Sequence, residues 1–225
     1  MSIKHWPEGE RPREKLLERG AGALSDAELL AILLRVGTRG MSAVDLARYL
    51  LNGFGSLGKL MNADIKSLSS YKGMGTASFT QFAVVKEIGR RILSEELREN
   101  IIFSNPQTVA DYLRLNLGHE RVEVSYALLL NRQNQLIAMR ELSRGTVAEN
   151  TVYIREIVKL ALGEYADSLI IAHNHPGGSA RPSEADIGFT KRLAQALDLV
   201  DVSLLDHFIV TAKEVCSLRE TGYMD

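Results

Sequence analysis

Two histidines stand directly after a short apolar segment of the chain. His173 and His175 follow residues 168–172, which read Ser-Leu-Ile-Ile-Ala and run toward a Pro-Gly-Gly break. A short segment rich in leucine and isoleucine that ends at such a break predicts a buried strand. Because successive side chains of a strand point to opposite faces, both imidazoles project the same way. Two imidazoles on one face can share one metal ion.

A carboxylate follows at the start of the next predicted element. Residues 183–197 have apolar positions at helical spacing, and Ser183 as N-cap places Asp186 in the first turn, aimed back toward the loop. Two imidazoles and one carboxylate leave a fourth position for water, which is the ligand set of a catalytic zinc site. A structural site would use thiolates, and the chain has one cysteine, Cys216. We therefore predict that His173, His175 and Asp186 bind Zn²⁺.

Each half of this pattern has a simpler explanation when it is taken alone. A His-x-His at a strand end is usually not a metal site, and Ser-x-x-Asp before an apolar helix is usually a capping box. The combination is more specific: seven residues separate His175 from Ser183. His-x-His, seven residues and Ser-x-x-Asp together resemble the JAMM motif of the MPN-domain zinc metalloproteases. The wording His-Asn-His-Pro at residues 173–176 looks like the bacterial RadC (UPF0758) branch of that family.

This resemblance implies a hydrolase of peptide or isopeptide bonds. Bound zinc lowers the pKa of its water and polarises a carbonyl, and a nearby carboxylate must carry the proton. The resemblance assigns that role to Glu123, although spacing alone does not separate it from Glu120. It also implies that Ser183 bonds near the zinc-bound water and steadies an oxyanion. His207 has two interpretations, as a residue that orients a ligand or as a core histidine satisfied by a neighbour.

The chain departs from the family's usual wording in two places. Gly177 stands where a serine follows the proline, and residues 153–156 read Tyr-Ile-Arg-Glu where His-Pro-Arg-Glu is common. Neither change touches a predicted ligand, so they bear on loop shape and substrate contacts. Other zinc enzymes fit less well, because the chain lacks the Pro-Cys-x-x-Cys of deaminases and the His-Glu-x-x-His of zincins.

The second part of the chain alternates predicted strands and helices. It predicts an α/β domain with a mixed sheet, helices on both sides and the site at the carboxyl ends of strands. We expect helices at residues 107–115, 154–165 and 183–197, a hairpin of strands at 124–130 and 135–142, a strand at 168–172, and either two strands or one bent strand at 202–205 and 208–211.

The first part predicts a small helical domain. Helical patterns cover residues 14–18, 26–34, 42–52, 60–68 and 76–97, after an extended segment at residues 1–12. The Gly73-Met74-Gly75 segment resembles a helix-hairpin-helix, in which backbone amides bind phosphate, and it also fits a plain interhelical turn. Residues 95–100 are charged and core-free in pattern. We therefore expect two domains, residues 1–100 and 101–225, hinged near residue 100.

Composition limits the classes of partner. The chain has 225 residues with 27 basic and 28 acidic side chains, and the two parts carry net charges of about +3 and −4. This asymmetry is too mild to predict a polyanion partner by itself. We expect a cytoplasmic protein, because the chain has neither an apolar run of membrane-span length nor an apolar signal region. The resemblance to the metalloproteases implies a protein or peptide substrate. The alternative is a DNA-associated protein that contacts DNA weakly through its N-terminal domain and has a non-catalytic metal site.

Overall fold

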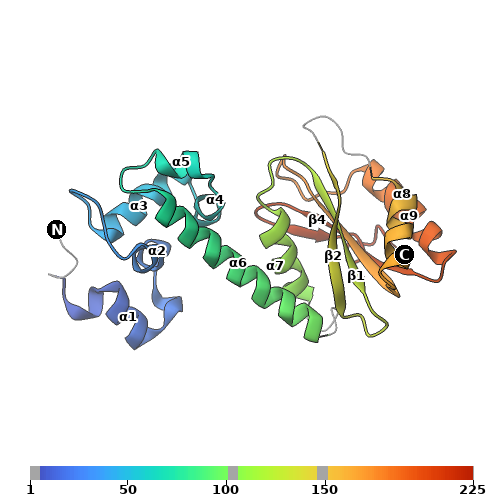
Figure 1. The fold of residues 1–225 in the computed structure, drawn as a ribbon, viewed down its shortest axis with the longest axis horizontal. Helices are drawn as coiled ribbons and strands as arrows, with labels where there is room; N and C mark the ends of the chain where they lie inside the picture. The colour runs from blue at the N-terminus through green and yellow to red at the C-terminus, as the bar shows by residue number, and fades with distance from the viewer. Residues whose placement is uncertain (1–5, 101–105, 146–151, 225) are drawn as a thin grey trace. The chain divides into compact units, whose positions relative to one another are not determined.

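The computed structural model describes residues 6–100, 106–145 and 152–224. The chain forms two compact units, Met1–Glu87 and Ile88–Asp225. One long helix, α6 (Thr76–Glu99), begins in the first unit and ends in the second (Figure 1). Residues 101–105, which follow the boundary predicted near residue 100, lie outside the described residues.

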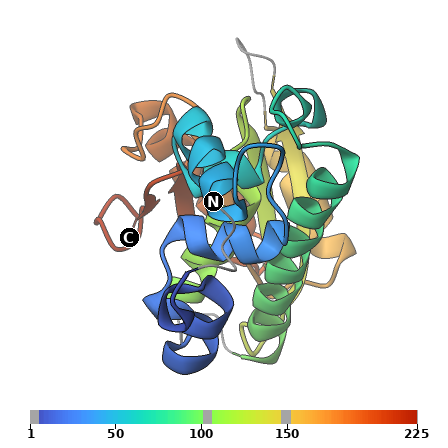
Figure 2. The ribbon, with the colours of Figure 1, turned by 90° about the vertical axis from the view of Figure 1, so that its left-hand side faces the viewer.

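The first unit is helical, as predicted. Its helices are α1 (Pro12–Arg19), α2 (Asp26–Leu34), α3 (Ala43–Phe54), α4 (Leu57–Met61), α5 (Ile65–Ser69) and the first part of α6, with short 3₁₀ turns at Glu8–Glu10 and Ala21–Ala23. Helix α1 packs against α2 and α2 against α3 (Figure 2). Ser25 and Ser42 begin α2 and α3 with capping boxes, so the sequence marks these helix starts directly.

Two predictions for this unit need correction or refinement. The helix expected at residues 60–68 is wrong, because the chain leaves α4 at Asn62 and the Asp64 side chain then caps α5 by accepting a hydrogen bond from the Ser67 amide. The segment expected to be extended contains the 3₁₀ turn at Glu8–Glu10. In the Gly-x-Gly turn, Gly73 has a φ of 87°, and a Cβ there would lie 2.8 Å from the Thr38 Cβ. Packing thus explains this glycine without a bound phosphate.

The second unit contains a five-stranded mixed sheet in the order β2-β1-β3-β4-β5. Strands β3 and β4 are parallel and the other neighbours are antiparallel. The α/β fold class predicted for this region is confirmed. The β1–β2 hairpin lies where two strands joined by a turn were predicted. The strands are β1 (Val124–Leu130), β2 (Leu136–Arg144), β3 (Ser168–Asn174), β4 (Ser203–Val210) and β5 (Val215–Ser217).

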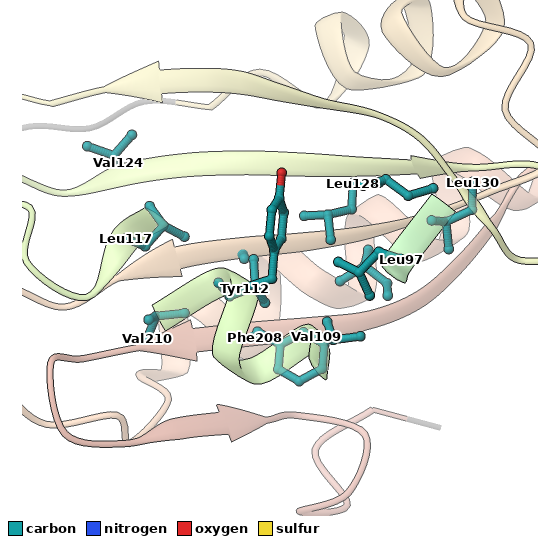
Figure 3. Close-up of a cluster of buried hydrophobic side chains, with 13 residues drawn as sticks. Leu97, Val109, Tyr112, Leu117, Val124, Leu128, Leu130, Phe208 and Val210 are labelled. Atoms are coloured by element: carbon teal, nitrogen blue, oxygen red, sulfur yellow. The ribbon is translucent and has the colours of Figure 1, made fainter. Parts of the chain in front are cut away.

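Helices cover both faces of this sheet. Helix α7 (Pro106–Leu117) packs on one face, where Tyr112 and Leu128 belong to a buried apolar cluster (Figure 3). Helices α8 (Ile154–Gly163) and α9 (Glu184–Asp198) pack on the other face, where Ile171 and Leu193 are buried (Figure 1). Strand β3 is buried along its whole length because both of its faces are covered.

One prediction for this unit is wrong, one left two possibilities that the structure now decides, and one strand was not expected. Residues 95–100 are not core-free, because α6 continues to Glu99 and Leu97 is 2 % exposed within the α7-side cluster. The segments expected at residues 202–205 and 208–211 form one strand, β4, whose pairing with β3 shifts register between Leu169 and Ile170. Strand β5 was not expected.

Within the described parts of the chain, no helix has the length and apolar composition that a bilayer crossing requires.

Candidate metal centre

Strand β3 brings the two predicted histidine ligands to the same place. His173 is the last but one residue of the strand, and His175 is the first residue beyond it. Their side chains lie on one face as the alternation requires, and their Nε2 atoms are 3.0 Å apart. His173 is 5 % exposed, whereas His175 is partly exposed. The pair therefore lies at the boundary between the core and solvent.

Helix α9 supplies the carboxylate. Ser183 is its N-cap, and the capping box turns Asp186 back toward the strand end. The Asp186 Oδ1 atom lies 3.3 Å from His173 Nε2, and its Oδ2 atom lies 3.6 Å from His175 Nε2. Among the described residues, these three are the set of histidine, cysteine and acidic side chains close enough together to hold one metal ion.

The spacing of these atoms fits zinc. Ligand atoms about 2.0–2.1 Å from a tetrahedral zinc ion lie about 3.3 Å from one another. The two Nε2 atoms are 3.0 Å apart, and each lies 3.3 or 3.6 Å from one oxygen of the Asp186 carboxylate, so the three side chains are as close together as the ligands of one zinc ion. Two imidazole nitrogens and one carboxylate oxygen are also ligand types that zinc accepts.

The charges of the three groups are already coupled. Burial works to raise the pKa of Asp186, but the nearby His173 and His175 imidazoles and the Ser183 hydroxyl outweigh it and hold this pKa well below its usual range. The hydrogen bond with Asp186 raises the pKa of His175 against the opposing effect of burial. Without a metal ion, the carboxylate therefore stabilises a proton on His175. A cation that replaced this proton would meet an ionised carboxylate.

Both imidazoles have their other nitrogen occupied. The Nδ1 atom of His175 lies 2.9 Å from the Ser179 carbonyl, to which it can only donate. The Nδ1 atom of His173 lies 2.8 Å from Nε2 of the buried His207. In metal sites the second ring nitrogen usually has such a partner, which fixes the ring and leaves the first nitrogen for the metal. In both rings, Nε2 is the atom directed at the other ligands.

The three groups open onto a pocket of about 420 Å³. The predicted base Glu123 and the predicted Ser183 both line it. The Ser183 hydroxyl donates to Asp186 Oδ2 at 2.6 Å and accepts from the Asp186 amide at 3.2 Å. The lining also includes the apolar residues Leu142, Val152, Ala185 and Phe189 and the positively charged side chain of Arg192.

The two glutamates that spacing could not separate lie in different surroundings. Glu123 precedes β1 and lines the pocket with the histidines. The Glu120 carboxylate instead forms an ion pair with Arg144 at 2.8 Å, and Glu120 is not part of the pocket lining. This arrangement supports Glu123 as the candidate base.

The side chain of Asn174, between the two histidines, holds the segment that carries Glu123. Its Oδ1 accepts from the Val124 amide at 2.8 Å, and its Nδ2 donates to the Val122 carbonyl at 3.0 Å. Backbone pairing of β1 with β3 ends at Ser125 and His173, so this amide continues the ladder past the strand end. Asn174 is 2 % exposed. The residues on both sides of Glu123 are thus hydrogen-bonded to β3, the strand that leads to the two candidate histidine ligands.

Sequence reasoning missed several groups around this centre. It did not single out Asn174, Thr190 or Arg192. It left His207 between two interpretations, and the structure places this residue against His173. A Thr four residues after a predicted helical ligand was the available signal for Thr190.

Two family models match separate parts of the chain. Residues 103–223 match the family described as RadC-like JAB domain, and residues 3–80 match the family described as UPF0758 N-terminal. The chain is 81 % identical over 224 residues to a UPF0758 protein of Neisseria meningitidis serogroup B. It is 54 % identical over 225 residues to a UPF0758 protein of Aromatoleum aromaticum and 51 % identical over 224 residues to one of Stutzerimonas stutzeri. Each alignment covers 100 % of both chains. The chain therefore belongs to the UPF0758 family and contains a RadC-like JAB domain.

Proposed function

We propose that this protein is a zinc-dependent hydrolase of peptide or isopeptide bonds. The observation that carries the proposal is the convergence of His173, His175 and Asp186 at the wall of an open pocket, where the two Nε2 atoms are 3.0 Å apart and 3.3–3.6 Å from the Asp186 carboxylate oxygens. Its three protein ligands leave room for a fourth, as catalytic zinc sites do. When bound there, zinc would activate a water molecule and polarise the carbonyl of the scissile bond.

Glu123 is the proposed proton carrier. Its carboxylate accepts a proton from the attacking water as the oxygen bonds to the carbonyl carbon, and returns it to the nitrogen as the carbon–nitrogen bond breaks. The Asn174 amide supports this role because it fixes the backbone at Val122 and Val124. The carboxylate therefore requires little reorganisation before it reacts.

Ser183 is the proposed donor to the oxyanion that develops on the substrate carbonyl. Its hydroxyl has one proton, which is directed at Asp186 Oδ2. Donation to the substrate requires this proton to turn away from Asp186. The cap would then rely on the hydrogen bond that Ser183 accepts from the Asp186 amide, and the helix start would be retained.

We further propose that residues 101–225 carry the hydrolase activity and that residues 1–100 form a separate helical domain. The family matches at residues 103–223 and 3–80 support a division of this kind. The alternative function, a DNA-associated protein, depends on phosphate binding at Gly73-Met74-Gly75. The conformation and packing of Gly73 account for this turn without a ligand.

The test compares metal content and turnover in matched variants. Wild type should retain about one zinc per chain and cleave members of a peptide library. His175→Ala should lose both zinc and activity. Glu123→Gln should keep zinc and lose about 10²- to 10⁴-fold in turnover, whereas Glu120→Gln, whose carboxylate is paired with Arg144, should stay near wild type.

Three outcomes would contradict the proposal or a part of it. Wild type that binds no zinc would remove the metal centre. Zinc-loaded wild type that cleaves no peptide or isopeptide substrate would remove the hydrolase. Full activity in Glu123→Gln with loss of activity in Glu120→Gln would transfer the base to the other glutamate.

A further inference from the structure

A chain of buried hydrogen bonds connects His173 to the helix that carries Asp186. His173 Nδ1 lies 2.8 Å from His207 Nε2, and His207 Nδ1 lies 2.6 Å from the Thr190 hydroxyl. The same hydroxyl lies 2.7 Å from the Asp186 backbone carbonyl. His207 and Thr190 are 2 % and 1 % exposed, so water does not compete for these contacts. The chain begins and ends at proposed metal ligands.

The Thr190 hydroxyl sets the direction of every proton in this chain. A carbonyl oxygen can only accept, so a hydroxyl 2.7 Å from the Asp186 carbonyl must donate to it. Having used its one proton, Thr190 can only accept from His207 Nδ1. A neutral His207 protonated at Nδ1 has a bare Nε2, which must accept from His173 Nδ1. His173 Nε2 is then left with its lone pair directed at Asp186 and His175.

His207 alone would not fix this arrangement. The other ligand, His175, contacts the Ser179 carbonyl, which accepts a proton whatever its surroundings. A neutral imidazole can either donate or accept at Nε2, so His207 is an ambiguous partner. Reversal of its tautomer would place the His173 proton on Nε2, where it blocks metal binding. Thr190 removes this ambiguity.

The fold places His207 in this position through a bulge. Leu169 pairs with Leu204, but the next residue, Ile170, pairs with Asp206, so β4 has one extra residue. Without it, His207 would point to the opposite face of the sheet. The backbone there is held by Asp206, whose Oδ1 accepts from the His207 amide at 2.7 Å and whose Oδ2 accepts from the Ser217 hydroxyl at 2.6 Å.

We propose that His207 and Thr190 are positioning residues that keep the His173 proton on Nδ1 and so keep Nε2 free to bind the metal. The inference rests on the proposed function only in taking His173 as a metal ligand. Both are positioning residues because His207 acts through His173 and Thr190 acts through His207. The tautomer itself is a property of the metal-free protein.

The experiment uses the full-length chain and needs no substrate. Nitrogen-15 NMR of the imidazole rings in the metal-free protein should show His173 and His207 both protonated at Nδ1. Thr190→Val keeps the side-chain shape and removes the hydroxyl, so His207 should move its proton to Nε2 and force the His173 proton onto its own Nε2. Zinc affinity, measured by chelator competition, should fall about 10- to 100-fold. Thr190→Ser keeps the hydroxyl and should restore both properties.

The outcomes separate this inference from the proposed hydrolase. Loss of thermal stability in Thr190→Val, with zinc affinity and tautomers unchanged, would show a merely structural role and overturn the inference. A wild-type His173 protonated at Nε2 would also overturn it, without the use of any variant. A wild type that binds zinc with the expected tautomers but cleaves nothing would contradict the hydrolase and leave the inference intact.

Discussion

Two helices of this protein begin with the same Ser-x-x-Asp box and differ in what surrounds it. At α3 the Ser42 hydroxyl donates to Asp45 Oδ2 at 2.6 Å and accepts from the Asp45 amide at 3.1 Å. At α9 the Ser183 hydroxyl makes the same two bonds with Asp186 at 2.6 and 3.2 Å. The local structure of the two boxes is therefore nearly the same.

Only the surroundings of the carboxylates differ. The pKa of Asp45 is lowered, first by the Ser42 hydroxyl and then by the Ser42 amide. Asp186 is more deeply buried, and the nearby His173 and His175 imidazoles lower its pKa further. The capping box fixes the direction of a carboxylate, but the end of β3 makes the one at α9 a candidate ligand. The α3 box is thus a natural control for the α9 box.

The largest expected difference between the boxes is in zinc binding. Asp186→Asn keeps a side-chain oxygen for the cap but removes the charge, so we expect zinc affinity to fall at least about 100-fold, beyond the usual effect of losing a ligand's supporting partner. Asp45→Asn makes the same change in a box without histidines and should leave zinc affinity unchanged. Chelator competition on both variants measures the difference. Equal zinc affinity in the two variants would remove Asp186 from the ligand set.

Removal of the two cap hydroxyls should have smaller and nearly equal effects. Ser42→Ala and Ser183→Ala each remove an N-cap, which costs about 1 kcal/mol of unfolding free energy. Urea unfolding of the metal-free protein measures this cost. If Ser183 also meets the substrate oxyanion, Ser183→Ala alone should lower the turnover of zinc-loaded protein. Equal turnover in both variants would limit Ser183 to its role as a cap.

The sequence could predict how the three proposed ligands are directed, because local geometry fixes the direction of each side chain. Strand alternation places His173 and His175 on one face, and the capping box turns Asp186 toward them, so only the meeting of β3 and α9 was left to the fold. Helix starts were also predictable where a side chain caps them, as at Ser25 and Ser42. Each of these features is encoded within a few residues.

The supporting residues were not predictable, because each depends on register or on distant backbone. The face on which His207 lies is decided by the extra residue in β4, which no local pattern marks. Asn174 binds backbone groups that are 50 and 52 residues away in the chain. Leu97 looked like part of a charged linker because its neighbours are charged, although it packs against α7 and β1 residues in the core.

Beyond the boxes, the two helices present different faces. Ala185, Phe189 and Arg192 follow one another at helical spacing along α9 and line the pocket. The equivalent positions of α3 include Val44 and Leu51, which pack into the helical core. The pocket thus gains an apolar wall and one guanidinium, and among the described residues the Arg192 guanidinium has neither a hydrogen bond nor an ion pair.

This difference predicts a preference for substrates with a carboxylate near the scissile bond. Arg192→Glu should lower kcat/KM for such peptides up to about fivefold, since an exposed ion pair contributes about 1 kcal/mol or less, and should not affect neutral peptides. Paired peptides with an acidic side chain or a free carboxyl terminus distinguish the two sources of charge. Lys191→Glu makes the same charge change on an exposed neighbour that does not line the pocket. The same change in selectivity from both variants would exclude a specific role for Arg192.

The smallest expected difference is in the pH dependence of metal-free stability. Because Asp186 raises the pKa of His175, this histidine contributes stability that is fully present below its unfolded pKa of about 6.5 and is lost as pH rises through the folded value. The lowered pKa values of Asp45 and Asp186 act in the opposite sense, with stability present above about pH 3.9 and lost only as pH falls. Between about pH 6 and 8.5, the stability difference between wild type and Asp186→Asn should therefore shrink, while the difference between wild type and Asp45→Asn should stay constant.

Zinc affinity should rise over the same range, because binding requires a neutral imidazole. Urea unfolding at the two pH values measures the slopes, and a difference for Asp186→Asn that does not change with pH would mean that the carboxylate and His175 are not coupled in solution.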